Sequence, residues 1–322
     1  MLSTVIAKAH RSSVARLAGF VGITLLSLFS LAGCAFNYLF VIPSEAKQQQ
    51  AADPVDPRQN GDVPQEIVVR NTNGHKLTGW LFAAPGDRGT VLVAGGNGMG
   101  IAHTYAYNRF LLGRHFRVLV FSYEGFDQNE GKADLATLPG DAEAFRAEIA
   151  RRYPTEPIAF VGESIGAIAG FCAPQANRFS ALVLEGLIDP KSIPYTVVYS
   201  YVPSPLSEMI AYGLRPVIAL YASSIPDSVD AAECSIRLAD APVMFINFRD
   251  DPVSSFANIE HLVALRPTHS TLVELPHPTT KGHLVLTHRP DTQNEVVDFI
   301  EGRFGNSGRI LAGAAPNTTV PR

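Results

Sequence analysis

Residues 160–170 read FVGESIGAIAG, and this stretch decides between the fold classes open to the chain. A continuous apolar run leads into it, and a run of small and apolar residues with helical character leaves it. Ser164 stands at the junction, with Gly162 and Gly166 two positions to either side. Gly-x-Ser-x-Gly at a strand-to-helix turn is typical of a serine nucleophile, because the glycines carry no side chain to clash with the neighbouring strand and helix. The alternative is a tight turn in which the serine has no chemical role.

Further short apolar runs surround this stretch: TVLVAGG (90–96), RVLVFSY (117–123), ALVLEG (181–186) and APVMFIN (241–247). Helix-length segments separate them, and in one of these segments apolar residues recur at helical spacing from Leu138 to Ile149. Strands that are apolar on both faces and alternate with helices indicate a parallel sheet covered on both sides. Ahead of them, residues 65–85 alternate around an Asn-Gly turn, which predicts an antiparallel hairpin. We therefore expect an α/β fold, a mainly parallel sheet with an N-terminal antiparallel hairpin.

Composition limits the classes of partner. The chain has 322 residues, of which 46% are hydrophobic and 17% charged, as expected for one large globular domain or two small ones. The net charge is −4, and the chain contains no block rich in Lys and Arg. We therefore expect no nucleic-acid partner, since such binding depends on a concentrated positive surface.

The N-terminus has the features of an export signal. Lys8, Arg11 and Arg16 precede an apolar stretch, residues 17–32, which is shorter than the roughly 20 residues of a membrane-spanning helix. It ends in LAGC (31–34), which resembles the bacterial lipobox, in which the cysteine becomes the lipidated first residue. We expect residues 1–34 to be a lipoprotein signal peptide ending at lipobox Cys34. An ordinary signal peptide or a single-helix anchor is the alternative.

The domain plan follows from this. Residues 46–63 are rich in Gln, Asp and Pro, so residues 35–64 are expected to form a linker. Residues 65–304 are expected to form the folded domain, and residues 305–322 a flexible tail. Ala35 follows the cysteine, where an Asp would resemble the inner-membrane retention signal, so an outer membrane is favoured.

Five motifs along the chain resemble successive motifs of the α/β-hydrolase superfamily, especially its BEM46-like serine hydrolases. They are VLVAGGNGMG (91–100), VFSYEGFDQNEGKAD (120–134), GESIG (162–166), NFRDDPVS (247–254) and KGHL (281–284). The resemblance covers roughly residues 65–304 and implies the α/β-hydrolase fold with a Ser-Asp-His triad. Related sequences commonly read Tyr-Arg-Gly-Tyr-Gly-x-Ser-x-Gly in the second motif; this chain has Glu124 for Arg, Asp127 for Gly and Asn129 for Ser.

The triad needs an acid and a base downstream of Ser164, in the order Ser, Asp/Glu, His. Asp250 and Asp251 follow the predicted strand 243–247. The family's Gly-x-x-Asp-x-x-Val spacing fits Asn247, Asp250 and Val253, so the resemblance favours Asp250, with Asp251 second.

The base is expected between the last strand and the final helix. His277, His283 and His288 lie there, and His283 is favoured because it follows a glycine and precedes an apolar pair, as the hydrolase base often does. His277 and His288 are expected to be structural residues.

The developing oxyanion needs backbone donors. We expect the N–H of Ile165, after the nucleophile, and the N–H of Asn97 in the glycine-rich loop 95–100. A phosphate-binding loop would require Gly-Lys-Ser/Thr, and a dinucleotide fingerprint would require glycine in place of Ile101, so both alternatives are disfavoured. No metal or organic cofactor is expected.

Two features stay open at this stage. Residues 187–237 are longer than one helix requires and are rich in Tyr, Pro and apolar residues, so they form either an inserted lid or an ordinary helix and loop with core tyrosines. Cys172 and Cys234 are expected to be two buried thiols, and a disulfide between them is the alternative.

These observations predict an envelope-anchored serine hydrolase that cleaves a carboxylic ester, or a thioester or amide, through an acyl-enzyme. Its substrate would be a small acyl ester or a lipid-like molecule, because an apolar lid suits an acyl chain. The alternative is a non-catalytic lipoprotein of the same fold that binds an envelope lipid or a partner protein.

Overall fold

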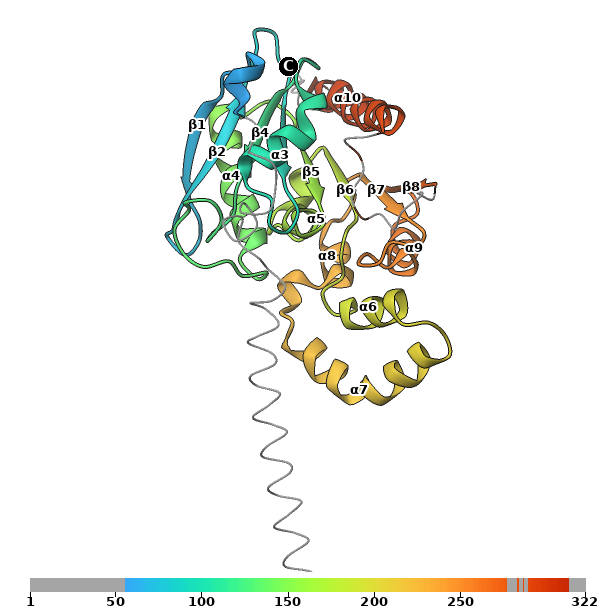
Figure 1. Ribbon diagram of the computed structural model, residues 1–322. Coiled ribbons are helices and arrows are strands. Elements are labelled where there is room, and N and C mark those ends of the chain that lie inside the picture. Colours follow the sequence, from blue (N-terminus) through green and yellow to red (C-terminus); the bar gives the residue numbers. More distant parts are fainter. Residues whose placement is uncertain (1–55, 277–282, 284–285, 287–288, 313–322) are drawn as a thin grey trace, which may run out of the picture. The chain divides into compact units, whose positions relative to one another are not determined.

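The computed structural model describes residues 56–276, 283, 286 and 289–312 (Figure 1). Within these residues one eight-stranded sheet has the order β1-β2-β4-β3-β5-β6-β7-β8. The strands are β1 (Gln65–Arg70), β2 (Lys76–Phe82), β3 (Thr90–Ala94), β4 (Arg117–Phe121), β5 (Ile158–Glu163), β6 (Ala181–Glu185), β7 (Val243–Phe248) and β8 (Ser270–Leu275). Strand β2 pairs antiparallel with β1 and β4, and all other neighbouring strands are parallel. The predicted mainly parallel sheet with an N-terminal antiparallel hairpin is confirmed.

The burial of the strands follows their sequence patterns. Strands β3, β5, β6 and β7 are buried at every residue, as their continuous apolar runs predict. The edge strand β1 alternates instead, and it turns only Ile67 and Val69 inward. Gly74 closes the predicted Asn-Gly turn at a φ of 81°, a conformation that glycine adopts without strain.

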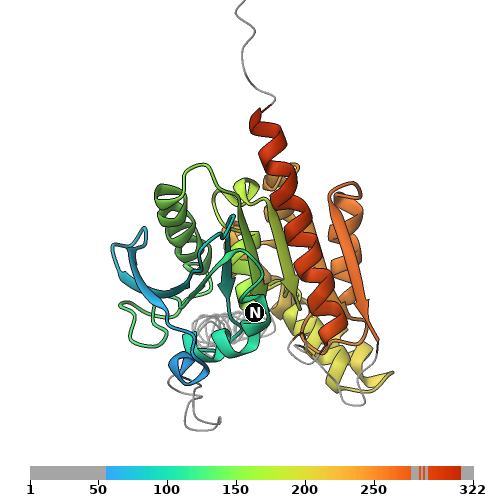
Figure 2. The same ribbon diagram turned by 90° about the horizontal axis from the view of Figure 1, so that it is seen from above.

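Helices cover both faces of the sheet (Figure 2). Helices α3 and α10 share one hydrophobic core with Val93, Val161 and Val183 of the sheet. On the other face, Phe145 of α4 stacks on Phe121 with ring centroids 4.6 Å apart. The α-helices are α3 (Ile101–Asn108), α4 (Leu138–Arg152), α5 (Ile165–Phe171), α6 (Ile193–Tyr201), α7 (Leu206–Ser224), α8 (Ala231–Arg237), α9 (Phe256–Leu265) and α10 (Pro290–Ala312). Short 3-10 turns are η1 (Pro57–Asn60), η2 (Arg109–Leu111), η3 (Ala176–Arg178) and η4 (Asp227–Val229).

Contacts to the folded domain begin within the predicted linker, and the last helix continues past the predicted end of the domain. In the predicted linker, Asp62 accepts a hydrogen bond from the Tyr105 hydroxyl at 2.7 Å and one from Arg109 Nε at 2.9 Å. At the other end, α10 continues to Ala312, although a tail was expected from residue 305. The predicted signal peptide with Cys34, residues 35–55 of the predicted linker and residues 313–322 of the predicted tail lie outside the described residues.

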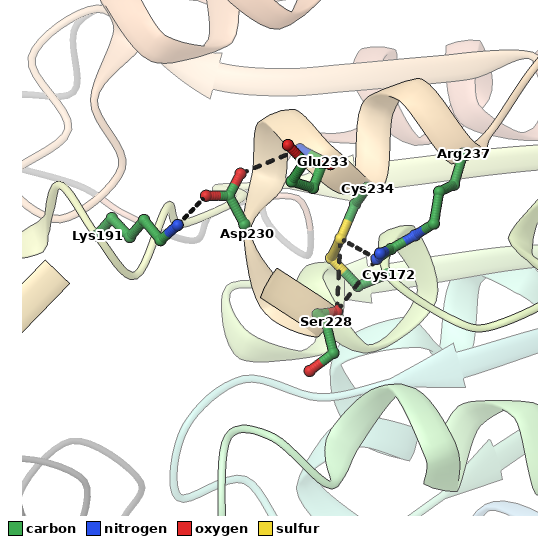
Figure 3. The surroundings of a disulfide bond; sticks show 7 residues. All are labelled: Cys172, Lys191, Ser228, Asp230, Glu233, Cys234 and Arg237. Carbon is green, nitrogen blue, oxygen red and sulfur yellow. Dashed lines mark hydrogen bonds and ion pairs between the residues drawn. A yellow bond between two sulfur atoms is a disulfide. The ribbon is translucent and has the colours of Figure 1, made fainter. Parts of the chain in front are cut away.

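The two remaining cysteines are bonded to each other, so the expectation of two thiols is wrong. Cys172 ends α5, Cys234 lies in α8, and these helices pack together with the two Cα atoms 5.0 Å apart. Figure 3 shows the guanidinium of Arg237 beside the bridge, 3.1 Å from the sulfur of Cys234. A sequence separation of 62 residues gave no indication of this proximity, which arises from helix packing.

The long connection between β6 and β7 folds as two helices followed by α8. Helices α6 and α7 pack mainly on each other and project from the body of the domain (Figure 1). Their tyrosines are not core residues: Tyr199, Tyr201 and Tyr212 are between 53% and 70% exposed. None of the helices within the described ranges combines the length and apolar character that crossing a bilayer requires.

Candidate active site

Ser164 occupies a strained turn between β5 and α5. Its backbone has φ 54° and ψ −112°, a region that a residue with a side chain rarely adopts. Its hydroxyl makes no capping hydrogen bond to α5, although serine at such a position commonly caps a helix. A serine that only capped α5 would not need this strained backbone. The strain therefore indicates that the hydroxyl is held in place for another role.

The two flanking glycines are required by close backbone contacts. A Cβ at Gly166 would clash with the carbonyl oxygen of Ala94, at the end of β3. A Cβ at Gly162 would lie 2.5 Å from the carbonyl oxygen of Gly166. The turn can therefore form only with glycine at both positions, because a side chain there would clash with the neighbouring strand or helix, as predicted from the sequence motif.

His283 and Asp251 form the closest acid–base pair of the site. Nδ1 of His283 lies 2.7 Å from Oδ2 of Asp251, whose side chain is fully buried. The other oxygen, Oδ1, accepts hydrogen bonds from the backbone N–H groups of Val253 at 2.8 Å and Ser254 at 2.7 Å. A carboxylate held by two amides orients the ring and leaves Nε2 as the nitrogen that can take a proton. Nε2 is buried and has no hydrogen-bond partner among the described residues.

This geometry corrects the preferred assignment of the acid. Asp250, favoured from the family spacing, is not the residue that contacts His283; its neighbour Asp251 is. The physical reason is that β7 extends to Phe248, one residue farther than predicted, and a turn then bonds Asp251 N to Phe248 O at 3.4 Å. The loop therefore begins one residue later. Asp250 and Asp251 both line a cavity of about 650 Å³ beside α6.

Gly186 links the histidine to the serine. The N–H of Ser164 donates to the carbonyl of Glu185 at 2.9 Å, so the turn lies beside the end of β6. The next residue, Gly186, lies against the imidazole: a Cβ there would lie 2.8 Å from Cε1 of His283. The described structure thus brings Ser164, His283 and Asp251 to the carboxyl end of β5, β6 and β7, where ligands bind in open α/β sheets.

The glycine-rich loop begins beside the same turn. It follows β3 and contains a turn closed by a hydrogen bond from Met99 N to Gly96 O at 3.0 Å, with Asn97 and Gly98 at its tip. Tyr123 fixes the start of the loop by donating from its hydroxyl to Gly95 O at 2.6 Å. Ile165, the other expected donor, is the first residue of α5 and is fully buried. Both stay predictions as oxyanion donors.

Three departures from the family motif make structural contacts. Glu124 accepts hydrogen bonds from Asn71 at 2.7 Å and Asn73 at 2.9 Å and joins the β1–β2 turn to the domain. The carboxylate of Asp127 accepts from Ile101 N at 3.0 Å, at the start of α3. Asn129 bonds Thr78 N at 3.0 Å. These substitutions support the loops around the site.

Two histidines considered from the sequence, His277 and His288, lie outside the described residues. Within the described ranges, no group of three His, Cys, Asp or Glu side chains is arranged to hold a metal ion.

Comparison with known proteins identifies the fold. No protein-family model matches the chain, and no curated protein sequence does. An esterase of Pyrococcus furiosus has a similar structure, with a TM-score of 0.61 and 16% identity over 83% of this chain and 98% of the esterase. A thermostable carboxyl esterase from Bacillus coagulans matches with a TM-score of 0.56 and 17% identity, over 75% of this chain and 99% of that chain. The strand order, the turn at Ser164 and these structures together show that the chain has the α/β-hydrolase fold.

Proposed function

We propose that this protein is an envelope-anchored serine hydrolase of carboxylic esters, with Ser164 as nucleophile, His283 as base and Asp251 as the acid that orients it. The single observation that carries the proposal is the pairing of His283 with Asp251 at 2.7 Å over Gly186, directly beside the strained turn of Ser164. A structural turn would need neither the buried acid–histidine pair nor the strain. The esterases of similar structure support the same reaction class.

The proposed reaction has two halves. Nε2 of His283 takes the proton of the Ser164 hydroxyl while its oxygen attacks the ester carbonyl, and the N–H groups of Ile165 and Asn97 stabilise the oxyanion. The alcohol leaves with the proton from His283, which leaves an acyl-enzyme. Water, deprotonated by the same imidazole, then releases the acid. Asp251 orients the ring through Nδ1 and stabilises the imidazolium in both halves.

The acyl part of the substrate is proposed to be apolar. Helices α6 and α7 expose a set of apolar side chains. Helix α6 also lines the 650 Å³ cavity beside Asp251, through Tyr195 and Tyr199. The most exposed members of the set are Tyr201, Met209 and Tyr212. An apolar surface of this kind favours an acyl chain or a lipid-like molecule over a charged metabolite.

The location is proposed from the sequence and from the disulfide. Disulfides persist mainly in oxidising compartments, which fits a chain exported through the predicted signal peptide. Lipidation at Cys34 would then hold the domain at the envelope, on the periplasmic side of an outer membrane, through the linker and without a membrane-spanning helix. The resemblance to BEM46-like hydrolases is part of the same proposal.

A fluorophosphonate probe tests the chemistry. We expect the probe to label wild-type protein and to leave Ser164→Ala unlabelled, and we expect Asp251→Asn to label far more slowly than Asp250→Asn. Absence of labelling in the wild type, or equal labelling of Ser164→Ala, would favour the non-catalytic lipoprotein. Short-chain and long-chain p-nitrophenyl esters would then define the acyl preference.

Lipid incorporation tests the anchor separately. Cells grown with a labelled fatty acid should incorporate the label into wild-type protein and not into Cys34→Ser. Membrane attachment that is unchanged in Cys34→Ser would contradict the lipoprotein assignment without affecting the proposed chemistry.

A further inference from the structure

Two buried glutamates lie side by side directly beneath the site. Glu163 precedes Ser164 at the end of β5, and Glu185 precedes Gly186 at the end of β6. The two residues are direct partners in the parallel register of these strands, and both face α3. They are 0% and 2% exposed. The proposed reaction uses neither carboxyl, yet keeping two acids together in a core is costly unless each has a defined partner and charge.

The surroundings of the two carboxyls differ. Glu185 accepts hydrogen bonds from the Tyr107 hydroxyl, at 3.1 and 2.9 Å to its two oxygens, and from the backbone N–H of Leu286 at 2.8 Å. Glu163 accepts one hydrogen bond, from Asn108 at 2.5 Å, and its Oε2 has no partner among the described residues. Burial, and to a lesser degree the charge of Glu185, raises the pKa of Glu163 well above its usual range, against the lowering effect of Asn108. The distribution of donors therefore favours a proton on Glu163 and a charge on Glu185.

Glu185 contacts the segment that carries the histidine. Leu286 lies three residues after His283, and its side chain is fully buried in the core shared by α3 and α10. Its N–H also lies 2.8 Å from the Tyr107 hydroxyl, so Glu185 and Tyr107 hold the same amide. The neighbour of Glu185, Gly186, lies against the His283 ring. Two successive residues at the end of β6 thus contact this segment: Glu185 binds the backbone of Leu286, and Gly186 lies against the ring of His283.

We propose that Glu185 is a positioning residue of this site: its carboxylate, with Tyr107, fixes the Leu286 backbone and thereby the place of His283 over Gly186. This proposal rests on the proposed function. A displacement of the imidazole by about 1 Å is enough to reduce turnover by on the order of a hundredfold, so an anchor three residues away can govern the rate without touching substrate.

The test compares the same substitution at the two partners. In Glu185→Gln we expect kcat to fall by about 10- to 100-fold, because both carboxylate oxygens accept from the Tyr107 hydroxyl and the amide would turn an NH2 donor toward that group. KM should change by less than about threefold, because the substrate does not contact this residue. Glu163→Gln replaces a neutral acid with a neutral amide that can still accept from Asn108, so its kcat should stay within about threefold of wild type. Tyr107→Phe should have an effect between the two.

Active-site titration separates positioning from loss of folded protein. Rates are divided by the amount of Ser164 that the fluorophosphonate labels at completion, so a variant that merely misfolds would show a normal rate per labelled site. Equal effects of Glu163→Gln and Glu185→Gln, or a normal rate per site in Glu185→Gln, would overturn the proposal.

A spectroscopic readout keeps the proposal independent of catalysis. The proton on His283 Nδ1, bonded to Asp251, should give a low-field NMR resonance that is assigned by its loss in His283→Gln. We expect this resonance to broaden or disappear in Glu185→Gln and to persist in Glu163→Gln. If wild-type Ser164 is not labelled but the resonance behaves in this way, the proposed function fails while the positioning role stands. A resonance that is unchanged in Glu185→Gln would contradict the positioning role.

Discussion

The central strands and the α6–α7 pair are both apolar in sequence, but the strands bury nearly all of their apolar residues while the pair leaves many exposed. Val93 and Val161 in β3 and β5 are fully buried, whereas Met209 and Tyr212 in α7 are 69% and 70% exposed. The 35 residues from 192 to 226 carry only two charged side chains, Glu208 and Arg215, so charge does not explain their exposure. The strands have helices on both faces, and α7 has little beyond α6 to pack against. Apolar sequence leads to burial only where the topology supplies a partner surface.

The α6–α7 pair is fixed at its base and exposed toward its tip. Lys191, just before α6, forms an ion pair at 2.5 Å with Asp230, which caps α8 (Figure 3). The Tyr221 hydroxyl, late in α7, donates to Pro190 O at 3.0 Å. The disulfide then ties α8 to α5. These contacts hold the ends of the insertion to the domain and leave Tyr201 and Met209 exposed near the bend.

The largest expected difference between the regions comes from adding one methyl group to a glycine. Gly166→Ala would drive its Cβ into the backbone of Ala94 and should destabilise the protein by about 4 kcal/mol or more, with loss of soluble protein. Gly213→Ala, in α7, meets nothing within 4 Å and should stabilise by up to about 1 kcal/mol, since alanine favours helix. Urea unfolding of both variants measures the contrast, and a stable Gly166→Ala would contradict it.

Loss of the disulfide should have the next largest effect. The bridge closes a loop of 62 residues, for which the chain-entropy model gives about 4 kcal/mol within a usual range of 2–5 kcal/mol. We expect Cys172→Ala with Cys234→Ala to lower the free energy of unfolding by about that amount. Reductant should destabilise wild type and leave the double variant unchanged; an insensitive wild type would rule out a bridge in solution.

A buried carboxyl on α4 should make stability depend on pH. Burial raises the pKa of Asp141 to about 6, opposed by hydrogen bonds from Glu124 N and Asn71 and assisted by the charge of Glu124. Its folded state therefore binds a proton more tightly than the unfolded chain. This contribution is fully present below about pH 4 and is lost as the pH rises through 6, by about 2–3 kcal/mol.

Asp141→Asn is the control for that prediction, because an amide cannot titrate. As the pH rises from 4 to 7, the free energy of unfolding of wild type should fall relative to that of Asp141→Asn. A difference that is constant over this range would show that Asp141 is ionised throughout.

Polar substitutions on α7 should change stability least. Met209→Ser with Tyr212→Ser should alter the free energy of unfolding by less than about 0.5 kcal/mol, since both side chains are already exposed. If the α6–α7 pair contacts acyl chains, kcat/KM should fall more for long-chain than for short-chain esters. Equal changes in kcat/KM for both ester lengths would show that this surface does not bind the substrate. A large loss of stability would show that the two side chains are buried in solution.

Much of the fold could be predicted because its signals are local. Alternation in residues 65–85 and the buried runs of the parallel strands follow from periodicity, and the glycines around Ser164 follow from the space that the turn requires. The helical stripe from Leu138 to Ile149 is buried as predicted. On the same helix, Asp141 and Arg146 lie off this stripe and are buried too, because the β1–β2 turn and α4's own Glu143 give them partners.

The roles of the candidate site residues were predicted less completely than the fold, because these roles depend on contacts between residues that are distant in the chain. Asp250 and Asp251 are chemically identical neighbours, and a one-residue extension of β7 decides which one contacts His283. The role proposed for Glu185 had no motif; its only sequence signal is an acid at the end of a buried strand.

By itself the sequence determined that this chain forms a mainly parallel α/β sheet with Ser164 at a strand-to-helix turn, since repeating apolar patterns and glycine spacing act over a few residues. Only the tertiary structure decided that Asp251 is the acid beside His283, that Cys172 is bonded to Cys234, and that Glu163 and Glu185 share one buried space. Each of these outcomes joins residues that are far apart in the chain, and packing, rather than local preference, brings them together.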